Sequence, residues 1–251
     1  MLLPKQALAN RLVDHLAPFG SMRPAIEQAV GKPVEWITTS PKAKKEMSLF
    51  DLIGSLMSGP ASKTSKVRDD SIAVLHLSGS IVDGKKPVSG SIVSGPTAEA
   101  IRELENDENV RGVVVRINSP GGSATASEVI RQALVSLSNK KPTVISMGSV
   151  AASGGYWISC IHQPVYAEEG TITGSIGVFA MKISFGTLLR RVGVRVEAIT
   201  LDESAAADSI DRGWSDSDTS NIQESIHEVY SRFLQLVSDS RKLPLVKVGP
   251  L

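Results

Sequence analysis

The sequence predicts an α/β fold, and two observations carry this prediction. Short runs rich in valine and isoleucine, typical of buried strands, alternate with stretches whose apolar residues recur at helical spacing. Two of these runs end in glycine-rich corners, at residues 120–122 and 153–155. Such an alternation is characteristic of a sheet covered by helices.

The main domain is predicted to begin at residue 71. Strands are expected at 72–77, 113–117, 141–147, 164–167, 176–180 and 194–200. Helices are expected at 96–106, 124–137, just after residue 153, near 186–192 and at 219–241. A glycine- and serine-rich loop should fill residues 79–95.

The helix at 219–241 has the clearest pattern in the chain. One stripe of its surface is apolar, and Asp216 and Asp218 suit its beginning, where acidic residues favour the helix dipole. Pro244 should end it. Upstream of the main domain, residues 32–70 form a connector with several prolines and one short amphipathic helix at 49–57.

Composition excludes several classes of function. The 251 residues are 41% hydrophobic, carry 27 basic against 26 acidic side chains, and are only 4% aromatic. A near-neutral chain in which no basic cluster is interleaved with aromatic residues is not expected to bind nucleic acid. No metal-ligand spacing and no phosphate-binding glycine loop is present, so we expect no metal and no cofactor. Cys160 stands alone and is expected to be a buried, small apolar residue.

Ser153 is the leading candidate nucleophile. It lies in Gly148-Ser-Val-Ala-Ala-Ser-Gly-Gly-Tyr-Trp157, where small neighbours leave room for an incoming carbonyl group. A serine between a strand and a helix sits near backbone N–H groups that favour developing negative charge. The alternative is a tight packing corner with no chemistry.

A second corner follows the strand at 113–117. It reads Asn118-Ser-Pro-Gly-Gly-Ser123, and paired glycines allow backbone N–H groups to face a cleft. An oxyanion hole needs such donors. An ordinary turn is the alternative for this corner taken by itself.

Three segments resemble successive signature blocks of the signal peptide peptidase A family: Asn118-Ser-Pro-Gly-Gly-Ser123, Val150-Ala-Ala-Ser-Gly-Gly-Tyr-Trp157 and Thr171-Ile-Thr-Gly-Ser-Ile-Gly-Val178. The resemblance covers about residues 71–242. It implies a Clp protease/crotonase-like fold of stacked β-α units and a serine peptidase with a serine–lysine dyad. Ser153 would be the nucleophile, and the amides of Gly121 and Gly122 would hold the oxyanion. Gly154 would belong to the same oxyanion and substrate-binding group, and Thr173, Gly174 and Ser175 would lie on the strand and loop beside the cleft.

The lysine of the dyad is not where short family members have it, because Glu203 occupies that place. The four histidines have no evident acidic partner, and Lys182 is expected to be a surface cation. Double-length members keep the lysine in their first repeat. Residues 1–31 resemble the helical tail of such a repeat, through Leu12-Val-Asp14.

The resemblance therefore implies the serine-bearing second repeat of a double-length enzyme, with a peptidase domain at 71–251 that looks truncated at its C-terminus. The lysine would come from a missing first repeat or a neighbouring subunit, and the chain alone would be nearly inactive. Its substrates would be hydrophobic peptides such as cleaved signal peptides. A homo-oligomer is expected, in the cell envelope, attached to the membrane through sequence absent from this chain.

Two other functions remain open from the sequence. A crotonase-like acyl-CoA enzyme would use similar backbone donors without a serine nucleophile. A non-catalytic half of an assembly would use the same fold only to build an oligomer.

Overall fold

The computed structural model describes residues 3–13, 70–200 and 203–248, together with the single residues 16, 26 and 31. In the N-terminal part, α1 (Pro4–Ala9) is a short helix with proline at its first position. The amphipathic helix expected at 49–57 lies outside the described residues. None of the described helices is long and apolar enough to cross a membrane.

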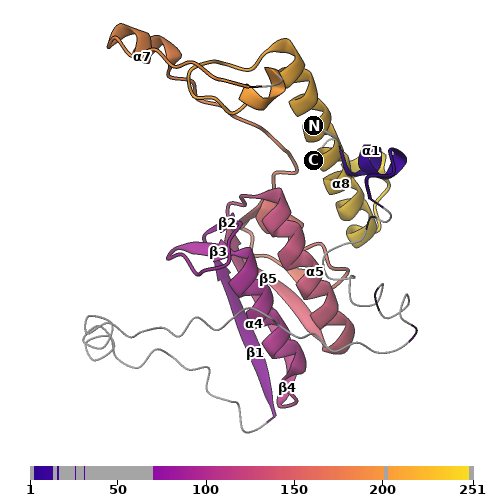
Figure 1. Ribbon diagram of the computed structural model, residues 1–251. Coiled ribbons are helices and arrows are strands. Elements are labelled where there is room, and N and C mark those ends of the chain that lie inside the picture. The colour runs from indigo at the N-terminus through magenta and orange to yellow at the C-terminus, as the bar shows by residue number, and fades with distance from the viewer. Residues whose placement is uncertain are drawn as a thin grey trace, which may run out of the picture.

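A parallel sheet forms the centre of the domain (Figure 1). Its path runs β1 (Ser71–Ser78), β4 (Val110–Ser119), β5 (Thr143–Ala152) and β6 (Val165–Tyr166), and β7 (Ile172–Gly174) pairs with the last residues of β5. The predicted α/β class is confirmed by this arrangement. The strands at 72–77, 113–117 and 164–167 are confirmed, and β5 extends five residues beyond the predicted end at Met147 to reach Ser153.

Two helices cover one face of this sheet. In Figure 1, α4 (Ser94–Asn106) and α5 (Ala124–Lys140) lie side by side in front of the strands. Both helices were predicted. Their buried side chains and those of the strands form the main core, which includes Ile101, Val115, Ile117, Ile130, Leu134, Leu137 and Ile145. Burial of this apolar surface is the dominant favourable contribution to folding.

A second cluster of buried side chains lies where α6 (Gly154–Trp157) meets α8 (Asp216–Arg241) and α9 (Leu245–Val248). Trp157 packs against Phe233 with ring centroids 4.7 Å apart. Helix α8 begins three residues before the predicted start because Ser215 caps it and Asp218 reaches back to the cap residue. This cluster connects the C-terminal helices to the segment that follows Ser153.

The structure differs from the sequence prediction in three places. The loop expected at 79–95 contains β2 (Ser80–Val82) and β3 (Ser91–Val93), which pair with each other. The strands predicted at 176–180 and 194–200 are wrong, since neither segment pairs with another among the described residues.

Helix α7 (Gly186–Arg191) lies between these two unpaired segments and is confirmed. Figure 1 shows it at the far end of an arm, residues 176–200, that extends away from the sheet. Apolar side chains along the arm are exposed: Phe179 is 86% exposed and Ile199 is 98% exposed. Their alternation resembles that of strands, but a strand also needs a partner that supplies hydrogen bonds.

Candidate active site

Ser153 lies directly at the end of β5 and just before α6. Its φ of +50° and ψ of −119° place it in a region that residues with a side chain rarely adopt. Such a conformation costs about 1–3 kcal/mol and persists only where the surroundings enforce it. Two hydrogen bonds do so: the Ser153 N–H donates to the Gly174 carbonyl at 2.9 Å, and the Trp157 N–H donates to the Ser153 carbonyl at 2.9 Å.

The hydroxyl of Ser153 has no hydrogen-bond partner among the described residues, although the side chain is half-buried. No described histidine or lysine bonds to it. Lys182 is engaged elsewhere, since its Nζ donates to the carbonyl of Ala207. Glu203 begins the short 3-10 helix η2 (Glu203–Ala206). Ser153 therefore combines a strained backbone with a hydroxyl that no described base contacts through a hydrogen bond.

The two glycine corners predicted from the sequence lie against each other. A Cβ atom built on Gly121 would lie 2.8 Å from the Cβ of Ser153 and 2.6 Å from the backbone nitrogen of Gly154. Gly121 has a φ of +101°. Only glycine combines this backbone conformation with so close an approach.

Gly122 is also restricted to glycine, because its Cα lies close to the backbone of β2. Its φ is +151°, and a Cβ built on it would lie 2.0 Å from the carbonyl oxygen of Ile81. The same residue of β2 donates its N–H to the Gly121 carbonyl at 2.9 Å. The short strand β2, which the sequence did not predict, thus fixes the corner that faces Ser153.

The backbone donors at this corner are not equivalent. The N–H of Gly121 donates to the Oγ of Ser119 at 3.1 Å. Neither the N–H of Gly122 nor that of Gly154 has a partner within the described part of the chain. A Cβ built on Gly154 would lie 3.2 Å from the Gly122 nitrogen, so the two unpaired donors are close neighbours. Two such N–H groups beside a hydroxyl can together stabilise an oxyanion.

Thr173, Gly174 and Ser175 lie beside this corner, on β7 and the residue after it. Thr173 donates its Oγ1 hydrogen to the Ala151 carbonyl at 3.0 Å. Gly174 and Ser175 both have positive φ values, of +77° and +50°. Ser175 is exposed at the point where the chain leaves the sheet for the arm.

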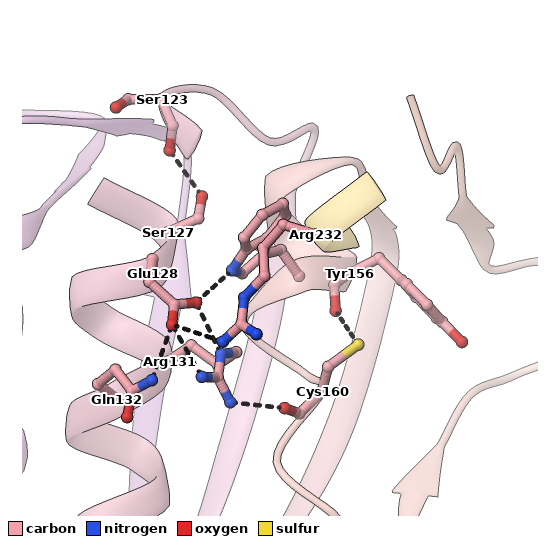
Figure 2. A network of polar contacts seen from close by, with 9 residues as sticks. Ser123, Ser127, Glu128, Arg131, Gln132, Tyr156, Cys160 and Arg232 are labelled. Carbon is pink, nitrogen blue, oxygen red and sulfur yellow. Dashed lines mark hydrogen bonds and ion pairs between the residues drawn. The ribbon is translucent and has the colours of Figure 1, made fainter. Parts of the chain in front are cut away.

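A partly buried carboxylate near this corner, whose side chain is 27% exposed, was not predicted from the sequence. Glu128 on α5 receives hydrogen bonds from Arg131, Gln132 and Trp157 (Figure 2). Burial alone would raise the pKa of this carboxyl, but the hydrogen bond and charge of Arg131, with the other two hydrogen bonds, lower it to about 2. The Glu128 and Arg131 spacing on one helix was visible in the sequence, but its tertiary partners were not.

Cys160 is buried as predicted and is 1% exposed. Burial raises the pKa of its thiol to about 12, although Arg131 and Arg241 act in the opposite direction. Because the thiolate is the reactive form, we expect native Cys160 to react with iodoacetamide at pH 8 about 10³-fold more slowly than the unfolded chain. Mass spectrometry of the alkylated protein with and without denaturant measures this ratio. Comparable rates in both states would contradict the burial of this thiol.

The described residues contain no group of three or more histidine, cysteine, aspartate or glutamate side chains arranged to hold a metal ion. The groups that the structure brings together at the corner are the serine hydroxyl and the backbone donors.

Comparisons with known proteins agree with this chemistry. Residues 136–251 match the family described as peptidase family S49. The chain is 37% identical over 239 residues to Protease 4 of Salmonella typhi, covering 95% of this chain and 36% of the relative. It is 39% identical to Protease 4 of Haemophilus influenzae, covering 72% and 29%. The chain thus spans about a third of the length of these relatives.

A plant relative and a solved structure extend the comparison. The chain is 31% identical to the chloroplastic serine protease SPPA of Arabidopsis thaliana, with 71% of this chain and 27% of the relative covered. A point mutant of ClpP1 from Listeria monocytogenes is similar at 13% identity and a TM-score of 0.43, with 70% and 77% covered. The matched family and the protease relatives together place this chain in peptidase family S49, the signal peptide peptidase A family.

Proposed function

We propose that this chain carries the nucleophile and oxyanion hole of a serine endopeptidase that cleaves hydrophobic peptides such as released signal peptides. The observation that carries the proposal is the strained Ser153, whose hydroxyl has no partner among the described residues, beside the unpaired N–H groups of Gly122 and Gly154. Membership of a peptidase family supports the same reaction class.

The proposed reaction begins when the Ser153 Oγ attacks the carbonyl carbon of the peptide bond and transfers its proton to a lysine amine. The Gly122 and Gly154 N–H groups then hold the carbonyl oxygen, which has become negatively charged. The lysine returns the proton to the leaving amine as the peptide bond breaks, and an acyl-enzyme remains. Water attacks the ester, and the same lysine takes and returns a proton as Ser153 is released.

The lysine is proposed to lie outside this chain, in a preceding repeat or a neighbouring subunit. To act as a base it must be neutral, which requires burial to lower its pKa from about 10.4 to about 7–8, a shift of roughly 4 kcal/mol. Lys182 does not fit this role because its amine already donates to a backbone carbonyl. The Protease 4 relatives are much longer than this chain, and this supports a lysine that lies outside it.

The exposed apolar residues of the arm favour a further protein surface that contacts this chain. Phe179, Met181, Ile183 and Ile199 are all largely exposed between the corner and α8. An apolar surface of this kind is typical of protein–protein contacts. We propose that a first repeat or a second copy of the chain covers it, as part of an oligomer in the cell envelope.

The experiment that tests the source of the base compares three samples in the hydrolysis of a hydrophobic fluorogenic peptide. These are the full-length gene product, the isolated 251-residue chain, and the isolated chain carrying Lys182→Ala. The proposal predicts hydrolysis by a full-length product that extends beyond this chain and little or none by either isolated form. Rapid hydrolysis by the isolated chain, abolished by Lys182→Ala, would contradict the external lysine.

A further inference from the structure

We propose that Glu128 is a positioning residue that fixes Ser153 and Gly154 relative to Gly122. This inference rests on the proposed function. Glu128 lies behind the corner rather than among its reacting groups, so it acts through the elements it joins. Its carboxylate connects three segments that are distant in sequence: α5, α6 and α8.

The contacts at the carboxylate use both of its oxygens (Figure 2). Oε2 accepts hydrogen bonds from Arg131 Nε at 2.8 Å and from Trp157 Nε1 at 2.8 Å. Oε1 accepts from Arg131 Nη2 at 2.9 Å and from Gln132 Nε2 at 2.7 Å, while Arg232 Nη2 of α8 lies 3.7 Å away. Hydrogen bonds to an ionised acceptor are stronger and more directional than those between neutral groups.

One route from Glu128 leads to the nucleophile. Trp157 is the last residue of α6, and its indole N–H points to Glu128 while its ring packs on Phe233. The backbone N–H of Trp157 donates to the Ser153 carbonyl. Because α6 has four residues, from Gly154 to Trp157, fixing its last side chain also fixes its first N–H group. Trp157 thereby links Glu128 to both Ser153 and Gly154.

A second route from Glu128 leads to the other glycine corner. The adjacent residue Ser127 donates its Oγ hydrogen to the Ser123 carbonyl at 2.8 Å, immediately after Gly122. A Cβ built on Gly154 would lie 2.6 Å from this Ser127 Oγ. The first turns of α5 thus touch both corners, and Glu128 locks the orientation of α5 against α6.

Arg131 completes the connection on the far side of α6. It is 5% exposed, holds Glu128 through two nitrogens, and donates its third, Nη1, to the Cys160 carbonyl at 3.3 Å. The loop after α6 is therefore held by the same ion pair. The hydrogen bonds that Glu128 accepts therefore fix the position of α6, the short helix that follows Ser153.

The proposal is tested by Glu128→Gln in the full-length protein, with Trp157→Phe and the double variant beside it. Glutamine keeps the volume but loses the charge, and phenylalanine keeps an aromatic ring but loses the indole N–H. We expect each single variant to lower kcat about 10-fold with KM changed less than about 2-fold, because a misplaced donor weakens the transition state. The double variant should be no slower than the slower single variant, because both act through one contact.

Glu105→Gln is the matched control. Glu105 on α4 is more deeply buried than Glu128 and accepts from Ser136 Oγ at 3.1 Å while pairing with Lys140, but none of these contacts reaches α6. We expect this control to lower the melting temperature while leaving kcat unchanged.

Two results would overturn the positioning role: wild-type kcat in Glu128→Gln, or an equal loss of kcat in Glu105→Gln. If Glu128→Gln fails to fold, wild-type kcat in Trp157→Phe overturns it instead. Absence of fluorophosphonate labelling at Ser153 in the wild-type protein would instead reject the proposed function itself.

Discussion

Replacing Ser153 with alanine is expected to lower kcat/KM for peptide hydrolysis at least about 10³-fold in the full-length protein. The change removes the oxygen atom that is proposed to form the acyl-enzyme, while the Cβ and the backbone hydrogen bonds to Gly174 and Trp157 remain. The melting temperature should therefore stay close to that of the wild type. Steady-state hydrolysis and differential scanning fluorimetry on the same preparation measure both quantities.

Ser138→Ala is the control for this substitution. Ser138 is on α5, and its hydroxyl donates to the Val135 carbonyl of its own helix at 3.0 Å. Its removal should leave kcat/KM unchanged. Retention of more than about a tenth of wild-type kcat/KM by Ser153→Ala would mean that another residue attacks the substrate.

Replacing Gly122 with alanine is expected to reduce the rate of fluorophosphonate labelling about 10²–10³-fold, the range that follows the loss of one oxyanion donor. The new Cβ would meet the Ile81 carbonyl oxygen at 2.0 Å, and the φ of +151° disfavours any side chain. The backbone must shift, and the N–H of Gly122 moves with it. Labelling rates measured against probe concentration give the second-order constant directly.

Gly170→Ala provides the matched glycine control for this experiment. Among the residues that the structure describes, nothing lies within 4 Å of a Cβ built on Gly170, and its φ is not positive. This variant should be labelled at the wild-type rate. If Gly122→Ala folds and is also labelled at that rate, the Gly122 N–H does not contribute to an oxyanion hole.

The sequence was informative where local pattern and burial coincide. Strand β4 is rich in β-branched residues and largely buried, strand β1 alternates between half-buried and exposed positions, and helix α5 shows a regular apolar face, so periodicity alone located them. Both glycine corners were located for the same reason, since their glycines follow strands directly. The prediction of two strands in the arm was wrong because its alternating apolar residues have no strand to pair with in the part of the chain that the structure describes.

The details of the candidate site depended on contacts that no local pattern contains. The Gly121 N–H is already hydrogen-bonded, because the side chain of Ser119 is oriented so that its hydroxyl oxygen accepts this bond. The role of β2 depends on the contact between Ile81 and Gly122. These residues are far apart in the sequence, and only the fold brings them together. The same holds for Glu128 and Trp157, whose contact joins residues 29 positions apart.

The central claim is that Ser153 is a nucleophile facing the N–H groups of Gly122 and Gly154. A crystal structure of the full-length protein after reaction with a fluorophosphonate tests it most directly. We predict a covalent bond between phosphorus and the Ser153 Oγ, with the phosphoryl oxygen about 3 Å from both backbone nitrogens. An adduct on another residue, or a phosphoryl oxygen directed away from both N–H groups, would contradict the claim.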